Sequence, residues 1–356
     1  GASRLCSLIL GLLLFQQHGC CLRNVATTEK MRYKSLLCCV AGYFLFSAIG
    51  AQTSGQETTK SVHGVPKVVD IENRSVDASD RIPNAVTIFL CGDVMTGRGI
   101  DQILPHPSDP TIYESYMKSA QGYVKIAEEV NGAIDFPVSF SYVWGKALEE
   151  MDRVVPDVKI INLETSITKS NDYWKGKGIN YRMHPENIPI LTAAKLDVCS
   201  LANNHVLDWG YSGLRETLDS FTEANIKIVG AGRNLSEAQM PAVKKVPSKG
   251  RVVVFAFGFG TSGIPSSWGA RDEKPGVDLL KDLGDKSLRD IQEKVRRVKH
   301  AGDIVVASIH WGSNWGYGIP RQQTVFAHRL IDGAGVDIIH GHSSHHVRAI
   351  EVYNDK

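Results

Sequence analysis

The stretch Val86-Thr87-Ile88-Phe89-Leu90-Cys91-Gly92-Asp93 decides the fold class, because a carboxylate directly follows a continuous apolar, β-branched run. Four more runs share this design, at 159–164, 197–205, 304–310 and 336–342, and they end on Glu164, His205, His310 and His342. Such runs are typical of buried strands in a largely parallel sheet that is covered on both faces. Parallel strands bring their carboxyl ends to one edge of a sheet, so we expect these distant polar residues to meet there.

The residues that end these runs are those that bind metal ions. Aspartate, glutamate, asparagine and histidine supply the oxygen and nitrogen ligands of hard or borderline divalent ions. Asp93 has an alternative interpretation, as the cap of a helix that follows Gly97. Glu164 would be a buried carboxylate, and it needs a partner because burying a lone charge is costly. Together the runs predict a metal site.

Two segments that contain histidine make the prediction of a metal site more specific. Asn203-Asn204-His205 is followed by Asp208, and a carboxylate that bonds one ring nitrogen fixes the tautomer of a histidine and raises its basicity. His205 and Asp208 therefore form a candidate acid/base pair, with an ordinary turn histidine as the alternative. The segment His340–His346 holds four of the 12 histidines of the chain, and a solvent-exposed histidine patch is its alternative interpretation.

Composition excludes several classes of protein. The chain has 356 residues, 43% hydrophobic and 22% charged, as a globular protein does. A net charge of +2 without blocks of Lys and Arg argues against nucleic acid as a partner. Cys91 and Cys199 are the two cysteines beyond residue 39, so a disulfide-rich scaffold is excluded. Free buried thiols are favoured over a bridge between them.

The first 83 residues are expected to lie outside the folded domain. Residues 1–30 form an uncertain leader, and residues 31–51 have the basic start, short apolar stretch and small residues of a signal peptide. A retained membrane anchor is the alternative, and both interpretations predict a secreted or membrane-anchored, extracytoplasmic protein. Residues 52–83 are polar and lack periodicity, which predicts a linker. The domain would occupy residues 84–356.

From residue 84 onward, apolar strand patterns alternate with helical patterns, which favours an α/β fold. The spacing of apolar residues predicts helices at 212–224, 287–301 and 322–331, and Ser287 is expected to cap the second of these. Further strands are expected at 227–230 and 251–258. The segment 105–144 is interpreted either as a helical insertion near the site or as ordinary helix packing, and 260–276 as a loop at its rim.

The motifs resemble those of the poly-γ-glutamate capsule biosynthesis (CapA-like) family, within the calcineurin-like metallophosphoesterase superfamily. They are Gly92-Asp93-Val94-Met95, Asn162-Leu163-Glu164-Thr165, 201–210, His310-Trp311-Gly312 and Gly341-His342-Ser343-Ser344-His345. The resemblance runs from about Thr87 to Tyr353. It implies a four-layer α/β/β/α sandwich of metallo-dependent phosphatase type, lacking its C-terminal strands, with two divalent metal ions (Mn, Zn, Fe or Mg).

The resemblance also implies roles for individual residues. Asp93 corresponds to the first-strand ligand, Glu164 to the bridging carboxylate, and Asn204 to the ligand asparagine. His310, His342 and His345 correspond to the remaining metal ligands, and His205 to a general acid. The sequence differs from superfamily phosphatases in having Met95 two residues after the first aspartate, glutamate at 164, and a Gly-His-x-x-His closing motif.

Two hypotheses of function follow. The first is a metal-dependent hydrolase acting on a phosphoester or an amide of a polyanionic substrate, with His205 oriented by Asp208. In it Arg98 and Arg182 hold the anion, although a surface salt bridge is an alternative role for Arg182. The second is a non-catalytic subunit that binds the anionic polymer within a membrane-bound synthesis complex. A third interpretation, a protein that kept the fold and lost the ions, predicts no stoichiometric metal.

Overall fold

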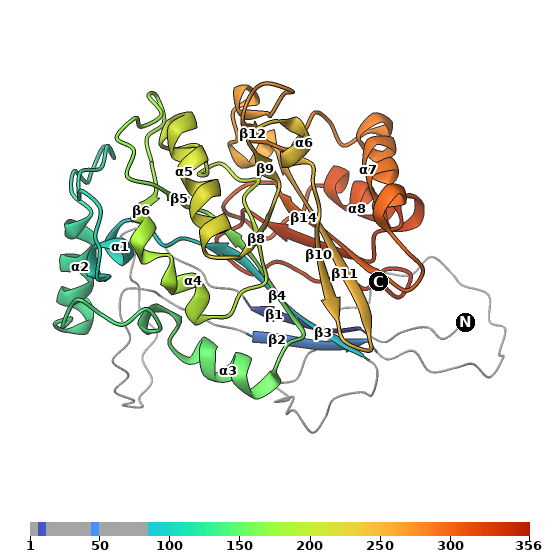
Figure 1. Cartoon of the computed structure of the whole chain (residues 1–356), viewed down its shortest axis with the longest axis horizontal. Coiled ribbons are helices and arrows are strands. Elements are labelled where there is room, and N and C mark those ends of the chain that lie inside the picture. The colour runs from blue at the N-terminus through green and yellow to red at the C-terminus, as the bar shows by residue number, and fades with distance from the viewer. Residues whose placement is uncertain (1–5, 12–43, 50–84) are drawn as a thin grey trace.

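The apolar runs of the sequence form the centres of two β-sheets in a mixed α/β architecture (Figure 1). The computed structural model describes residues 6–11, 44–49 and 85–356. The first sheet has the strand order β2-β1-β3-β4-β7-β8, and β1, β3, β4, β7 and β8 run parallel. These strands are β1 (Cys6–Gly11), β2 (Phe44–Ile49), β3 (Val86–Val94), β4 (Val158–Leu163), β7 (Val198–Ser200) and β8 (Lys227–Val229).

The second sheet has the order β10-β11-β14-β15, with β13 also paired to β11. Its strands are parallel except for β10. Three of the five apolar runs therefore lie in the first sheet and two in the second, a division that the pattern within each run cannot encode. The strands are β10 (Ala242–Val246), β11 (Gly250–Phe259), β13 (Leu279–Leu280), β14 (Ile304–His310) and β15 (Ile338–His342).

Strand alternation divides the interior into three hydrophobic clusters. Ile88 and Leu90 of β3 pack with Val254 of β11 in a cluster drawn from both sheets. Phe89, between them in sequence, faces the opposite side, because successive strand residues point to opposite faces. There the first sheet packs against helices α1 to α5, and Val253 of the second sheet packs in a third cluster with residues of α7 and α8.

The helices agree with the sequence patterns in position, and one cap differs. The three predicted helices are α5, α7 and α8, and each helix end lies one to three residues from its predicted position. Ser287 does not cap α7, because the helix begins at Asp285 with Gly284 as its N-cap. The bounds are α1 (Gly99–Ile103), α2 (Gln121–Asn131), α3 (Lys146–Val154), α4 (Pro189–Ala193), α5 (Gly210–Glu223), α6 (Leu235–Ala238), α7 (Asp285–Val298) and α8 (Arg321–Ala334).

The two long connecting segments contain short elements. Segment 105–144 holds α2 and a 3₁₀ turn at Tyr142–Trp144, and Trp144 and Val124 pack in the cluster on the outer face of the first sheet. Segment 260–276 holds 3₁₀ turns at Gly260–Ser262 and Ser266–Trp268. The remaining short elements are β5 (Ser166–Ile167), β6 (Arg182–Met183), β9 (Ala231–Gly232), β12 (Gly276–Val277) and a 3₁₀ turn at Pro185–Asn187.

The N-terminal part contributes two strands to the first sheet, β1 beside β3 and β2 beside β1. Most of the expected leader, signal segment and linker lies outside the described residues, so these boundaries stay predictions. Among the described residues no helix is long and apolar enough to cross a bilayer. Cys91 and Cys199 are both buried and are not joined by a disulfide, which confirms the favoured interpretation of the two cysteines.

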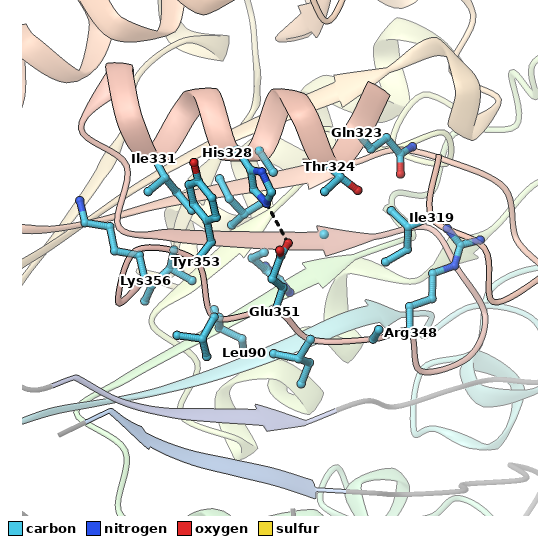
Figure 2. A pocket seen from close by; sticks show the side chains of 18 of the residues that line it. Leu90, Ile319, Gln323, Thr324, His328, Ile331, Arg348, Glu351, Tyr353 and Lys356 are labelled. Carbon is cyan, nitrogen blue, oxygen red and sulfur yellow. Dashed lines mark hydrogen bonds and ion pairs between the residues drawn. The ribbon is translucent and has the colours of Figure 1, made fainter. Parts of the chain in front are cut away.

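A cavity of about 520 Å³ lies between α8, β15 and the segment that follows β15 (Figure 2). Leu90, Ile319 and Ile331 are among its apolar lining residues, and the His328 Nε2 to Glu351 Oε2 contact of 2.9 Å lies at its wall. Tyr353 and Lys356 exchange two backbone hydrogen bonds of 2.8 and 3.0 Å around two residues with positive φ, as in a two-residue hairpin turn. The expected absence of further C-terminal strands stays a prediction.

Candidate metal centre

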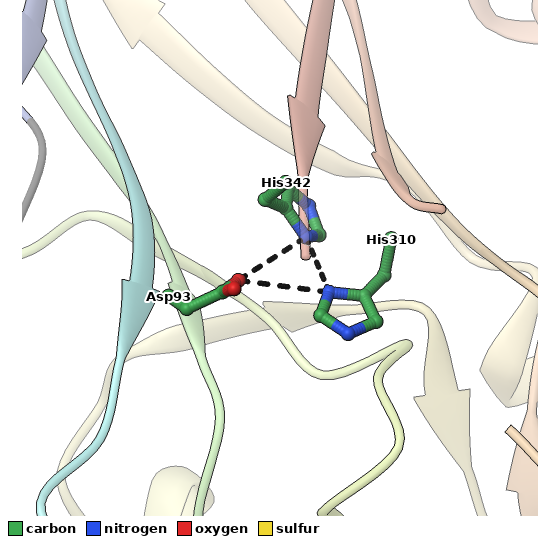
Figure 3. A group of neighbouring side chains, drawn as sticks. All are labelled: Asp93, His310 and His342. Carbon is green, nitrogen blue, oxygen red and sulfur yellow. Dashed lines mark hydrogen bonds and ion pairs between the residues drawn. The ribbon is translucent and has the colours of Figure 1, made fainter. Parts of the chain in front are cut away.

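Asp93, His310 and His342 converge from three strands of the two sheets (Figure 3). Parallel pairing sets His310 opposite His342 at the ends of β14 and β15. Their Nδ1 atoms are 2.8 Å apart, and they lie 3.6 and 3.7 Å from Asp93 Oδ1. Three possible ligand atoms thus lie within 4.8 Å of one another, although the residues are separated by up to 249 positions in the chain.

A relay of hydrogen bonds orients His342. Its Nε2 lies 2.9 Å from Ser308 Oγ, and the same hydroxyl lies 3.0 Å from Nδ1 of His340. A hydroxyl has one proton, so it can accept from His342 Nε2–H while it donates to His340 Nδ1. In that arrangement the lone pair of His342 Nδ1 points to the centre, because the other nitrogen carries the proton.

His310 is oriented in the same way by Asn204. Its Nε2 lies 3.0 Å from Asn204 Oδ1, an acceptor, so this nitrogen carries the proton and Nδ1 has the lone pair. Burial lowers the pKa of His310 and of His342 well below the usual value, so both rings are neutral. Neutral imidazoles are the form of histidine that binds metals.

Asp93 completes the first group and is held by two donors. Asn162 Nδ2 lies 2.7 Å from Oδ1 and the Ser343 backbone N–H lies 3.1 Å from Oδ2. Burial raises the pKa of Asp93 to about 7 in spite of these bonds. Asp93 does not cap α1, which has no side-chain cap. The lone pairs of His310 Nδ1 and His342 Nδ1 and the carboxylate of Asp93 therefore face one point, where they repel one another. A divalent cation bound at this point would be coordinated by all three groups and would remove the repulsion.

A second group consists of Asp93, Glu164 and His345. Glu164 follows β4, and its Oε1 lies 3.6 Å from His205 Nε2 and 3.9 Å from His310 Nε2. Burial, followed by the nearby charge of Asp93, raises the pKa of Glu164. Asp93 is the carboxylate common to both groups, whereas the resemblance assigns the bridging position to Glu164; that assignment stays a prediction.

His205 and Asp208 form a buried pair beside this centre. His205 Nδ1 lies 2.5 Å from Asp208 Oδ2, and the Asp208 oxygen also accepts from the Tyr181 backbone N–H at 2.7 Å. The Tyr181 ring stacks on the imidazole with 3.9 Å between centroids. Burial lowers the pKa of His205 to about 4, with the Asp208 charge acting in the opposite direction. The ring is therefore neutral near pH 7, with Nε2 facing Glu164.

The comparisons with known proteins identify the family. A model described as "Bacterial capsule synthesis protein PGA_cap" matches residues 87–356. The chain belongs to this family. A relative from Mycobacterium tuberculosis, described as "Probable polyglutamine synthesis accessory protein", is 49% identical over 275 residues, which are 77% of this chain and 72% of the relative. The resemblance to the capsule biosynthesis (CapA-like) family is thereby confirmed.

Two relatives from Bacillus are described as CapA proteins. The "PGA biosynthesis protein CapA" of Bacillus subtilis is 34% identical over 76% of this chain and 60% of its own length. The "Capsule biosynthesis protein CapA" of Bacillus anthracis is 27% identical over 75% of this chain and 56% of its own length. The chain therefore spans less than two thirds of either Bacillus protein.

The two arginines that the sequence suggests as anion-binding residues, Arg98 and Arg182, are both buried and bonded to other residues of the chain. Arg98 forms an ion pair with Glu114, and its guanidinium lies 4.8 Å from the Tyr181 ring centroid. Arg182 donates to the backbone oxygens of Ser170 at 2.8 Å and Asp109 at 3.0 Å. Arg182 is only 6% exposed, so its contacts are not those of a surface salt bridge. Substrate binding by either arginine stays a prediction.

Sequence reasoning missed several residues that orient the centre. Asn162 and Ser308 are polar residues inside buried strand runs, which is a signal that could have singled them out. Tyr181 and Lys177 lie in the irregular connection between β5 and β6, where no periodicity marks them. Lys177 contacts both Asp208 and the Asn204 carbonyl oxygen, and its Nζ lies 3.0 Å from His205 Nδ1.

Proposed function

We propose that this protein is a metal-dependent hydrolase of the capsule and poly-γ-glutamate biosynthesis type, acting on a phosphoester or an amide of a polyanionic substrate. The observation that carries the proposal is the convergence of Asp93, His310 and His342 from both sheets. His310 and His342 are buried, the side chain of Asp93 is 8% exposed, and each of the three is oriented by a second polar residue, as metal ligands are.

The fold belongs, in this proposal, to the four-layer α/β/β/α sandwich of the metallo-dependent phosphatases. Support comes from the three hydrophobic clusters, one between the sheets and one on each outer face. Two divalent ions, of Mn, Zn, Fe or Mg, are proposed because two groups of possible ligands share Asp93. Asn204 would add an amide oxygen beside His310.

The chemistry assigns a role to each residue of the site. Divalent ions in such a centre acidify water and stabilise the negative charge that develops on the reacting oxygens. Asn162 and the Ser343 N–H hold the carboxylate of Asp93 toward the centre. His205 exchanges a proton with the leaving group through Nε2, and Asp208 and the Tyr181 ring fix the plane of its imidazole.

The substrate class and the setting are part of the proposal. The printed names of the relatives concern polyglutamine, capsule and PGA synthesis, so an anionic polymer or a phosphoester precursor is the proposed substrate. A secreted or membrane-anchored location and a membrane-bound synthesis complex are proposed from the signal-like segment at 31–51 and from these names. Nucleic acid is not a proposed partner, because the net charge is only +2.

A non-catalytic subunit is the second candidate, favoured by the description of the M. tuberculosis relative as an accessory protein. The test is metal analysis of the purified chain, joined to a screen of phosphoesters and γ-glutamyl peptides with Mn or Zn. The hydrolase is expected to bind close to two ions per chain. His205→Ala should keep those ions and lose turnover by roughly 10²-fold or more. Full metal occupancy without turnover on either substrate class would favour the binding subunit.

A further inference from the structure

A short exposed loop beside the metal centre carries three large apolar side chains. It connects β14 to α8, and its residues 313–320 are all exposed. Trp315 is 46% exposed, Tyr317 79% and Ile319 41%. Single exposed apolar residues are ordinary, whereas three within five positions form a patch of the kind that marks a binding site.

The base of this loop is fixed to the segment that holds the closing histidines. The Asn314 carbonyl oxygen accepts the backbone N–H of His345 at 2.8 Å. Arg348 donates to the Ser313 carbonyl oxygen at 3.0 Å, and Ser313 Oγ donates to the Trp315 carbonyl oxygen at 2.8 Å. The backbone that carries the indole is therefore held in place before any ligand binds.

The Trp315 ring lies next to a candidate metal ligand. Its centroid is 5.2 Å from that of His345, and the two ring planes are nearly perpendicular, at 78°. His345 shares a group of possible ligand atoms with Asp93 and Glu164. Glu164 Oε1 in turn lies 3.6 Å from His205 Nε2. The indole therefore lies on the side of the centre where the proposed proton donor would meet the leaving group.

His346 joins Trp315 and Tyr317 into one aromatic surface. Its ring is nearly parallel to that of Trp315, at 6.3 Å and 19°, and lies 4.5 Å from the Tyr317 ring. His346 Nδ1 lies 2.9 Å from the Val347 carbonyl oxygen, a contact that fixes the plane of the imidazole. The two larger rings are thus supported from within the protein and remain exposed to solvent.

We propose that Trp315, together with Tyr317, forms a stacking platform for a ring carried by the leaving group of the substrate. The inference rests on the proposed function and deepens it, because it narrows the substrate to a phosphoester of a ring-bearing alcohol. A γ-glutamyl chain has neither a ring nor a broad apolar face, so the platform would have no counterpart in it.

Stacking requires only a flat apolar face on the ligand. One base stacked on one aromatic side chain contributes roughly 10- to 100-fold in affinity, and the contact tolerates different bases. A nucleobase, a sugar ring and a phenyl ring all offer such a face. The shared chemistry of the proposed ligand is therefore a phosphoester with one ring near its ester oxygen.

A bilayer surface is the competing partner for an exposed loop of this composition, because Trp and Tyr are enriched where proteins meet the membrane interface. The position of Trp315 against His345 favours the substrate. A membrane contact needs no fixed place beside the candidate ligands, whereas a platform for a leaving group does.

The experiment is a calorimetric titration of the zinc-loaded full chain with benzylphosphonate and with ethylphosphonate. The two ligands share the phosphonate group and differ in the ring. The wild type should bind benzylphosphonate roughly 10- to 100-fold more tightly, and Trp315→Ala should lower this ratio roughly 10-fold. Trp315→Phe keeps an aromatic face and should retain most of the ratio, and Tyr317→Ala should lower it by a smaller factor.

Tyr142→Ala is the matched control, because Tyr142 is 40% exposed on the 3₁₀ turn that precedes α3 and lies outside the loop. It should leave the ratio unchanged. Any change in zinc affinity cancels, because both ligands are measured on the same variant. If Trp315→Ala fails to fold by circular dichroism, Tyr317→Ala decides.

Equal binding of the two phosphonates by the wild type overturns the inference and leaves the proposed function standing, and so does a ratio that Trp315→Ala does not change. If neither phosphonate binds, the inference and the phosphoester substrate both fail. Competition by uridine 5′-monophosphate or by glucose 6-phosphate then distinguishes a nucleobase from a sugar ring. Sedimentation with phosphatidylglycerol vesicles that Trp315→Ala abolishes, joined to equal phosphonate binding, would assign the loop to a membrane surface and overturn the inference.

Discussion

Replacing Ser308 with alanine tests whether the hydrogen-bond relay behind His342 supports the metal centre. Ser308 is fully buried in β14, and its hydroxyl lies 3.0 Å from His340 Nδ1 and 2.9 Å from His342 Nε2. The substitution leaves two buried ring nitrogens without this partner. An unsatisfied buried polar group costs about 1–3 kcal/mol, so we expect Ser308→Ala to lower the free energy of unfolding by about 2–4 kcal/mol.

The same change should weaken metal binding, because His342 then loses the acceptor that keeps its proton on Nε2. Outer partners of metal-binding histidines typically contribute 10–100-fold in affinity, and we expect the dissociation constant for Zn or Mn to rise by that factor. Urea unfolding of the chelated protein measures the first effect, and calorimetric metal titration measures the second.

Ser200→Ala is the control for this pair of measurements. Ser200 is fully buried in β7, and its hydroxyl has no hydrogen-bond partner among the described residues. Its removal takes away a buried polar group that has no partner, so it should not lower the free energy of unfolding and should leave metal affinity unchanged. If Ser308→Ala binds metal as tightly as wild type, the relay does not orient His342, and the ligand assignment of that residue loses its main support.

Two further predictions concern acid stability and a buried ion pair. Burial lowers the pKa of His340 to about 4, below the usual 6.5, so at this group the unfolded chain binds more protons, and the stability it contributes is lost as pH falls from about 6.5 to about 4. His340 alone contributes roughly 3 kcal/mol, while the raised pKa of Asp93 acts in the opposite direction, so the Tm of the chelated wild type should fall by more across this window than that of chelated His340→Gln. An equal change of Tm in the two proteins would contradict it. Arg98→Met should lower the free energy of unfolding by about 3–5 kcal/mol because Glu114 is left buried and unpaired, and Arg98→Met/Glu114→Gln should recover part of it in urea unfolding. Equal losses in the single and double variants would show that the ion pair does not account for the effect.

The strands and the residues at their ends could be predicted from sequence because both depend on local patterns. The run 86–93 alternates between two faces that are both covered, which explains why it contains no polar position before Asp93 apart from the nearly buried Thr87. His310 and His342 lie side by side because they end adjacent parallel strands, and parallel strands bring their carboxyl ends to the same edge of a sheet. Such features need no knowledge of the rest of the molecule.

The partners of these residues could not be predicted in the same way. Lys177 reaches His205 across 28 positions from a loop without periodicity, and its role depends on how that loop folds back over Asp208. The prediction that Ser287 caps α7 is wrong, because the helix begins two residues earlier, at Asp285. Helix propensities do not locate the end of a helix to within two residues. Loop geometry and helix ends depend on tertiary contacts, whereas strand interiors depend on burial alone.

The metal centre also bears on how the two sheets are held together. Asp93 belongs to the first sheet and His310 to the second, and the hydrogen bonds that cross between the two sides include Ser343 N–H to Asp93 and His310 Nε2 to Asn204. A cation bound by both sheets would bind the folded chain alone, because the ligands are far apart in the unfolded chain. Ligand linkage then adds about 2.7 kcal/mol of stability at a free metal concentration of 100 times Kd. The centre would therefore strengthen the packing between the sheets in addition to its chemistry, and its loss should destabilise both sheets together.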